Sequence, residues 1–272
     1  MSALSLPRRD RATPLWSRAL FGLLVQYRRT WRSSVEMNFI YPVLYLSAMG
    51  IGLGGLVNRH LAASHAAALG GVSYLAFIAP GILASSAMQI STQEGTWPIL
   101  GRFKWERTYL AMAQTPLRAK DILTGQLAFV ALRQLMTSAV FVVMMWAFGA
   151  LTSPEALVAL PVGVLVGLAF ATPCIAFTAT QETDAGFPTI HRLIVIPLFL
   201  FSGSFFPITQ LPRPLQLLAM ATPLYHGVAL ARAATLGHLA TSASVGHAGY
   251  LLALALFGAL VARRTFERRL VR

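Results

Sequence analysis

The chain has 272 residues, of which 56% are hydrophobic and only 11% are charged. Because a soluble globular protein is about a quarter charged, and because apolar runs recur between residues 37 and 262, the composition excludes an ordinary soluble domain and predicts an integral membrane protein. The net charge of +13 lies mostly between apolar runs, so we expect it to set orientation in the bilayer and not to bind nucleic acid.

The chain begins with an arginine-containing tail and an amphipathic helix. Residues 1–13 lack the apolar core and cleavage site of a signal peptide, and we expect a flexible tail. Over residues 14–35, aromatic and leucine side chains recur on one side of a predicted helix, and arginines occupy the others. Its marker residues are Trp16, Leu20, Tyr27 and Arg29. The pattern favours an interface helix on the cytoplasmic headgroups over a helix docked on a soluble partner.

Six membrane-spanning helices follow. They are predicted at about residues 37–56, 72–93, 122–151, 156–180, 189–206 and 245–261. Lysine and arginine gather in the N-terminal segment, in the loop after the second span and in the C-terminal tail. Because positive residues favour cytoplasmic loops, both termini are expected in the cytoplasm. The predicted fold is therefore all-α, with one transmembrane domain over residues 1–272.

The cytoplasmic loop 94–121 is the longest inner loop, and it is basic. A short helix is predicted within it at 103–114, with both apolar and charged faces. Its candidate contact residues are Arg102, Lys104, Trp105, Arg107, Tyr109 and Met112. Such a helix is suited to docking into a groove of a soluble partner or to lying on the headgroups through its basic residues. Composition leaves both alternatives open.

Arg133 is the charge expected deepest in the membrane. It follows Asp121 by 12 residues, or roughly 18 Å along a helix. A charge at that depth normally faces a cavity or a polar partner, and Gln89 on the second span is a candidate neighbour. Arg133 would therefore either line a pathway or anchor one helix to another, and the sequence does not separate these roles.

Aromatic residues gather where an outer pathway would open. Tyr41 and Tyr45 lie one helical turn apart on the first span, and Phe201, Phe205 and Phe206 crowd the end of the fifth. They are typical of a membrane-interface belt. Lining for an amphipathic substrate is the alternative.

The stretch 199–237 interrupts its apolar runs with a Ser-Gly pair and repeated prolines. Broken backbone at membrane depth is tolerated only where protein or a water-filled cavity covers it. We therefore predict an outward-facing re-entrant region over 207–240, with Pro207 at its entry and Arg232 near its end. An ordinary surface loop between two helices is the alternative.

The sequence contains no P-loop, no zinc or calcium motif, and no catalytic cluster at recognisable spacing. We therefore expect neither an enzyme nor a bound metal or cofactor. A channel or secondary transporter acting alone is a competing function. The acidic residues fall at predicted span ends or in loops, which argues against ion coupling inside the membrane.

Four segments carry a family resemblance. They are YLAFIAPGILASSAMQ (74–89), GRFKWERTYLAMAQTPLRAKDILTGQ (101–126), VGLAFATPCIAFTAT (166–180) and LFLFSGSFFPITQLPRPLQLLAMATPLYHGVALAR (198–232). With these motifs in order, the chain resembles the permease subunit of type-2 ATP-binding-cassette exporters, and within that family the nodulation protein J group. The resemblance extends over about residues 15–265.

The resemblance implies a type-2 permease in a bacterial inner membrane, with six spans, an interface helix and a re-entrant pair. It implies a dimer, with a second copy or a related permease, and two separate P-loop ATPase subunits that bind MgATP. The loop helix at about 105–114 looks like the coupling helix of the family, and the start of the interface helix would be a second ATPase contact. The cargo would be amphipathic or lipid-linked, such as a lipo-oligosaccharide, a glycolipid or a hydrophobic drug, passing outward along the first, second and fifth spans.

Overall fold

The computed structural model describes residues 14–53, 72–151, 153–239 and 242–271. Within these ranges all regular structure is helical. The predicted flexible tail 1–13 lies outside the described residues, as do the last residues of the predicted first span and residue 240 of the predicted re-entrant region.

The helices follow one another along the chain. The first half holds α1 (Leu15–Ser47), the π-helical turn η1 (Ala48–Leu53), α4 (Tyr74–Glu94), α5 (Trp97–Lys104), α6 (Thr108–Ala113) and α7 (Ala119–Ala147). The second half holds η2 (Pro154–Val158), α8 (Ala159–Thr178), α9 (Phe187–Ile190), η3 (His191–Val195), α10 (Ile196–Phe201), η4 (Ile208–Gln210), α11 (Arg213–Met220), α12 (Pro223–Leu236) and α13 (Ser242–Val271).

Four helical segments are long and apolar enough to cross a membrane. They are Tyr74–Lys104, Ala119–Ala147, Pro154–Thr178 and Ser242–Leu270. These segments match the second, third, fourth and sixth predicted spans. The first and fifth predicted spans are not among the segments that meet both criteria in the described residues, so six spans remain a prediction.

The fifth predicted span, 189–206, is shorter in the structure. The apolar helix covers Phe187–Phe201. It ends there because Gly203 has a φ of 83°, a left-handed conformation through which a right-handed helix does not continue.

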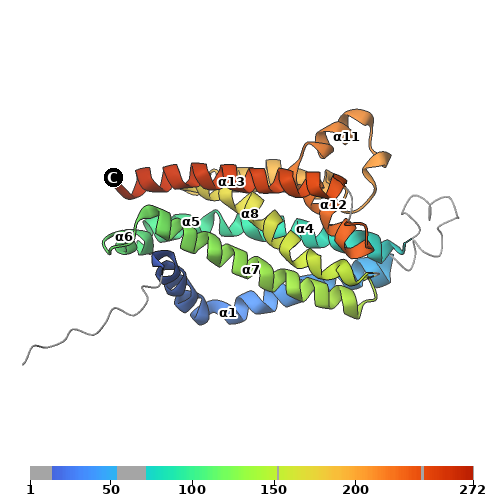
Figure 1. The fold of residues 1–272 in the computed structure, drawn as a ribbon, viewed down its shortest axis with the longest axis horizontal. Coiled ribbons are helices and arrows are strands. Elements are labelled where there is room, and N and C mark those ends of the chain that lie inside the picture. The colour runs from blue at the N-terminus through green and yellow to red at the C-terminus, as the bar shows by residue number, and fades with distance from the viewer. Residues whose placement is uncertain (1–13, 54–71, 152, 240–241, 272) are drawn as a thin grey trace, which may run out of the picture.

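Helix α1 joins two elements that were predicted separately. The predicted interface helix and the start of the first span form one helix, Leu15–Ser47. The junction residues 33–36, Ser-Ser-Val-Glu, include no proline or glycine, so no local signal ends the helix there. In Figure 1 the beginning of α1 lies across the direction of its later part.

Helices α4, α7, α8 and α13 run together along the long axis of the molecule (Figure 1). Helix α8 is central, because it contacts α4, α7, α12 and α13. Helices α5 and α6 lie at the end of the bundle where α13 finishes, and α12 lies toward the opposite end. A buried apolar cluster joins α4, α8, α12 and α13 through residues such as Met88, Val166, Leu224 and Leu251.

Two glycines let α7 and α8 approach closely. A Cβ on Gly163 would lie 2.0 Å from Ser138 Oγ, and a Cβ on Gly167 would lie 2.5 Å from Gln134 Cγ. A larger residue at either position would force the facing side chain of α7 to shift. The small-residue motif of the fourth predicted span therefore serves packing inside the bundle.

Candidate functional site

The loop 94–121 forms two short helices with a turn between them. Helices α5 and α6 are separated by residues 105–107, so the single helix predicted over 103–114 is wrong. Arg107 has φ 52° and ψ 23°, a left-handed conformation that residues other than glycine rarely adopt. The two N–H groups before it both donate to the carbonyl oxygen of Gly101, which closes α5 and turns the chain.

The predicted docking residues divide into two groups. Trp105 is 61% exposed, and Lys104 and Arg107 are exposed beside it at the turn. Arg102 and Tyr109, by contrast, are buried. The turn thus offers the Trp105 ring and the Arg107 guanidinium to a partner, whereas Lys104 Nζ donates to the Glu182 carbonyl oxygen at 2.8 Å. The buried residues hold the loop to the bundle.

One glutamine of α7 anchors the buried residues. Gln126 Oε1 accepts hydrogen bonds from Arg102 Nη1 at 3.0 Å and from the Tyr109 hydroxyl at 2.8 Å. Burial raises the pKa of Tyr109 to about 12, so the phenol remains a donor at neutral pH. Its ring also packs against Phe103 and against Phe266 of α13, with centroids 4.9 and 5.5 Å apart. The loop is therefore in direct contact with both α7 and α13.

Helix α1 packs against the same loop and against α7. Gln26 Nε2 donates to Glu106 Oε2 at 2.8 Å, and the Tyr27 ring lies edge-on to Phe129, with centroids 5.7 Å apart. A Cβ on Gly125 of α7 would lie 2.7 Å from a side-chain carbon of α1. The N-terminal helix is thus part of the folded unit around the loop.

The remaining residues of this region lie around those contacts. Trp16 and Arg29 are exposed, and Leu20 is half-buried. Met112 of α6 reaches α1, since its Cε is 3.2 Å from the position of a Cβ on Gly22. Trp16 and Arg29 are therefore free to meet headgroups or a protein, and the geometry leaves both alternatives open.

Arg133 of α7 pairs with a carboxylate at the end of α4. Its Nη1 donates to Glu94 Oε1 in an ion pair, and its guanidinium lies 5.2 Å from the centre of the Tyr27 ring. Helix side chains lean toward the helix N-terminus, so an arginine on α7 reaches toward the loop. This lean places its charge with Glu94, the first residue of the predicted cytoplasmic loop and the last residue of α4.

A second polar contact joins the same two helices. Gln134 Nε2 donates to the Ala87 carbonyl oxygen at 3.2 Å and to Ser91 Oγ at 2.5 Å. Gln89, the predicted neighbour of Arg133, has a buried Nε2 without a hydrogen-bond partner among the described residues. The structure thus joins Arg133 to Glu94, and among the described residues Gln89 Nε2 forms no hydrogen bond with Arg133.

The aromatic residues expected at the outer end are brought together only in part. The Tyr45 ring lies 6.4 Å from Phe199 and 6.5 Å from Phe205, and the two phenylalanine rings are 4.8 Å apart. Phe201 is exposed. The side chain of Tyr41 lies outside the described residues. The rings of Tyr45, Phe199 and Phe205 form a cluster between the end of α1 and the turn after α10, and an interface belt and a substrate lining both stay open as predictions.

The turn 202–207 packs directly on α4. A Cβ on Gly81 would lie 2.7 Å from the carbonyl oxygen of Ser204, and the hydroxyl oxygens of Ser85 and Ser204 are 2.8 Å apart. Phe206 and Pro207 are half-buried. The broken backbone is thus covered by protein, as membrane depth would require.

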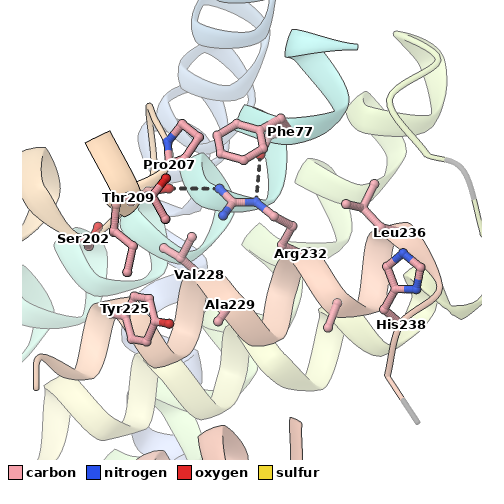
Figure 2. A pocket seen from close by; sticks show the side chains of 13 residues that line it. Phe77, Ser202, Pro207, Thr209, Tyr225, Val228, Ala229, Arg232, Leu236 and His238 are labelled. Carbon is pink, nitrogen blue, oxygen red and sulfur yellow. Dashed lines mark hydrogen bonds between the residues drawn. The ribbon is translucent and has the colours of Figure 1, made fainter. Parts of the chain in front are cut away.

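Arg232 of α12 joins this turn to α4. Its Nε donates to the Phe77 carbonyl oxygen at 3.2 Å, and its Nη2 donates to the Gly203 carbonyl oxygen at 2.9 Å. Its guanidinium carbon lies 3.8 Å from the centre of the Phe77 ring. Arginine stays protonated in proteins, so the group is charged at neutral pH. Figure 2 shows the guanidinium between Phe77 and the turn, with Pro207 and Thr209 nearby.

Sequence reasoning named Arg133 and Arg232 but missed their partners. Glu94 was assigned to a loop, and the carbonyl groups that bind Arg232 carry no sequence signal. Gln126 was missed as well, although a lone amide at the start of an apolar helix is a recognisable polar position. These residues act through contacts between distant segments.

Comparison with known proteins places the chain among membrane transport proteins. The model of the family described as ABC-2 type transporter matches residues 19–236. Nodulation protein J of Rhizobium leguminosarum bv. trifolii is 34% identical over 248 residues, which are 91% of each chain. Nodulation protein J of R. leguminosarum bv. viciae is 32% identical over 246 residues, 90% of this chain and 91% of the relative. The Rhizobium meliloti (strain 1021) protein is 31% identical over 245 residues, 90% of each chain.

Proposed function

Because the chain belongs to the ABC-2 type transporter family, we propose that it carries an amphipathic or lipid-linked substrate outward, driven by separate ATPase subunits docked at residues 105–107. Membership of the family gives the chain its role as a membrane permease. The docking site, the class of substrate and the direction of transport are our proposals. Nodulation protein J relatives at 31 to 34% identity over nine-tenths of the chain make a lipo-oligosaccharide or related glycolipid the first cargo to test.

The exposed turn 105–107 is the observation that carries the docking proposal. Trp105 and Arg107 stand free at its surface, and a large ring beside cations is typical of a protein interface hot spot. Beneath the turn, the hydrogen bonds of Gln126 connect it to α7. A force that a bound partner exerts on the turn would therefore act on the helix bundle and not on the loop alone.

The energy would come from the partner subunits. With no P-loop in this chain, two P-loop ATPase subunits would bind MgATP and pull on the turns of a permease dimer. The second permease would be another copy or a related chain. The complex would lie in the bacterial inner membrane, with the turn 105–107 and both termini in the cytoplasm.

Affinity purification tests the docking site. The tagged chain, extracted from its native host in mild detergent, should bring a P-loop ATPase in about equal amount, identified by mass spectrometry. In the Trp105→Ala/Arg107→Glu variant we expect the recovered ATPase to fall by about tenfold or more, because an aromatic and a charge contact are lost together.

A matched variant keeps the test specific. Trp146 is 73% exposed at the other end of α7, and Arg213 is exposed in α11, so Trp146→Ala/Arg213→Glu makes the same chemical change away from the turn. It should retain the ATPase. Equal recovery in both variants would exclude residues 105–107 as the docking site, and a chain that always purifies alone would favour a channel or secondary transporter.

A further inference from the structure

The cavity beside Arg232 combines one positive charge with an apolar wall. It has a volume of about 360 Å³, within the range of small-molecule sites. Phe77, Val228 and Leu236 supply apolar surface, and Tyr225 adds a hydroxyl (Figure 2). No acidic side chain is among the residues that line it. Within the described chain, Arg232 forms no ion pair.

The guanidinium of Arg232 has hydrogen-bonding capacity left over. Of its five N–H donors, one on Nε and one on Nη2 bind uncharged carbonyl groups. Its Nη1 has no hydrogen bond to any described residue and is not sealed inside the protein. A guanidinium withdrawn from water without a counter-ion is unfavourable, and a bound anion would satisfy both its charge and its free donors.

We propose that this cavity binds an oxyanion, a phosphate or carboxylate group, carried at the head of an amphiphile. Arg232 would hold the charged group, because its planar fork matches two oxygens of such an anion. The apolar wall would hold the carbons next to the headgroup. The inference rests on the proposed export function only in taking the amphiphile to be a transported substrate. Binding itself is a property of the permease alone.

Three probes separate the charge from the tail. The purified full-length chain, in nanodiscs of uncharged lipid, is titrated with octyl phosphate, octyl glucoside and inorganic phosphate. Octyl phosphate should bind about tenfold more tightly than octyl glucoside, because only the phosphate pairs with Arg232. Inorganic phosphate should bind more weakly than octyl phosphate, because it lacks the tail.

The variants are chosen to keep Arg232 and its two carbonyl contacts in place. Ala229 lines the cavity one turn before Arg232, so the carboxylate of Ala229→Glu can pair with the guanidinium in place of the ligand. Ala229→Gln has the same size without the charge. Ala229→Glu should abolish the preference for octyl phosphate, and Ala229→Gln should keep it. Arg213→Gln removes an exposed positive charge elsewhere in the outer region and should change nothing.

Several results would overturn the proposal. Equal binding of octyl phosphate and octyl glucoside would exclude recognition of the anion. A preference that survives Ala229→Glu would place the anion elsewhere. Inorganic phosphate binding as tightly as octyl phosphate would exclude the amphiphile. Because these binding experiments contain no ATPase, none of their results bears on the docking of an ATPase at residues 105–107, which the affinity purification tests separately.

Discussion

At the scale of single residues, the charged groups in the bundle are held by specific partners. Arg133 joins α7 to Glu94 of α4 and to the Tyr27 ring of α1, so one side chain ties three helices together. The ion pair with Glu94 neutralises the charge of Arg133 without substrate, although its buried Nε has no hydrogen-bond partner among the described residues. The geometry therefore favours an anchor at Arg133, whereas Arg232 has no counter-ion among the described residues and lies beside a cavity.

The anchor predicts an asymmetric response to mutation. Glu94→Gln should destabilise the chain by roughly 3 kcal/mol, because it leaves the buried charge of Arg133 without a counter-ion. The double variant Glu94→Leu/Arg133→Met should recover most of that loss, because it removes both charges and keeps their volume. Thermal unfolding in detergent, followed by tryptophan fluorescence, measures both, and a double variant no more stable than Glu94→Gln would contradict the anchor.

At the scale of helices, close approach depends on glycines at chosen positions. Gly167 of α8 faces Gln134 of α7 so closely that a Cβ would lie 2.5 Å from Gln134 Cγ. The same glutamine bonds to Ser91 of α4. Packing and hydrogen bonding are therefore coupled at one point where three helices meet.

This coupling predicts the effect of one added methyl group. Gly167→Ala should destabilise by about 1–3 kcal/mol, because the methyl group overpacks the contact and displaces Gln134 from its bonds. Adding Gln134→Ala should cost less than the sum of the two single changes. Gly246→Ala in α13 is the control, since nothing lies near its Cβ position, and it should be neutral or slightly stabilising. Equal unfolding temperatures for Gly167→Ala and Gly246→Ala would refute the close contact.

The sequence predicts helices better than their boundaries. Hydropathy located the four segments that the structure also finds long and apolar, because burial in lipid requires continuous apolar runs. It missed the break in the loop helix, since Arg107 adopts a left-handed conformation without a glycine to signal it. It also divided α1, where a change of composition comes without a helix-ending residue.

For the candidate sites, the sequence likewise predicts single residues better than their partners. Charged residues in apolar surroundings, such as Arg133 and Arg232, stand out because their burial is unfavourable without a partner. Their partners lie 39 residues away at Glu94 and 155 residues away at the Phe77 carbonyl. Only the packing of the whole bundle brings these groups together, so no local pattern could have predicted them.

At the scale of the whole molecule, helices α5 and α6, which flank the proposed docking turn, and helix α12, which carries Arg232, lie toward opposite ends of one packed bundle (Figure 1). The buried contacts of Tyr109 reach α7 and α13. Helix α13 in turn packs on α8 and α12, and α12 carries Arg232. A transport cycle that tilts these helices would strain the turn 202–207, where Ser204 rests on α4.

A reversible cross-link tests whether that turn moves. The hydroxyl oxygens of Ser85 and Ser204 are 2.8 Å apart, close enough for cysteines there to form a disulfide with small adjustments. In a Cys174→Ala background, oxidation of the Ser85→Cys/Ser204→Cys variant should lower ATP turnover of the reconstituted permease–ATPase complex by about tenfold, because the cross-link opposes movement of the turn. A rise of about 1.4 kcal/mol in the activation barrier is enough for a tenfold loss. A reductant should restore turnover, and the single variant Ser85→Cys should respond to neither treatment. Full turnover with the cross-link complete would mean that residues 202–207 stay fixed to α4 throughout the cycle, and the route outward would then have to open elsewhere in the bundle.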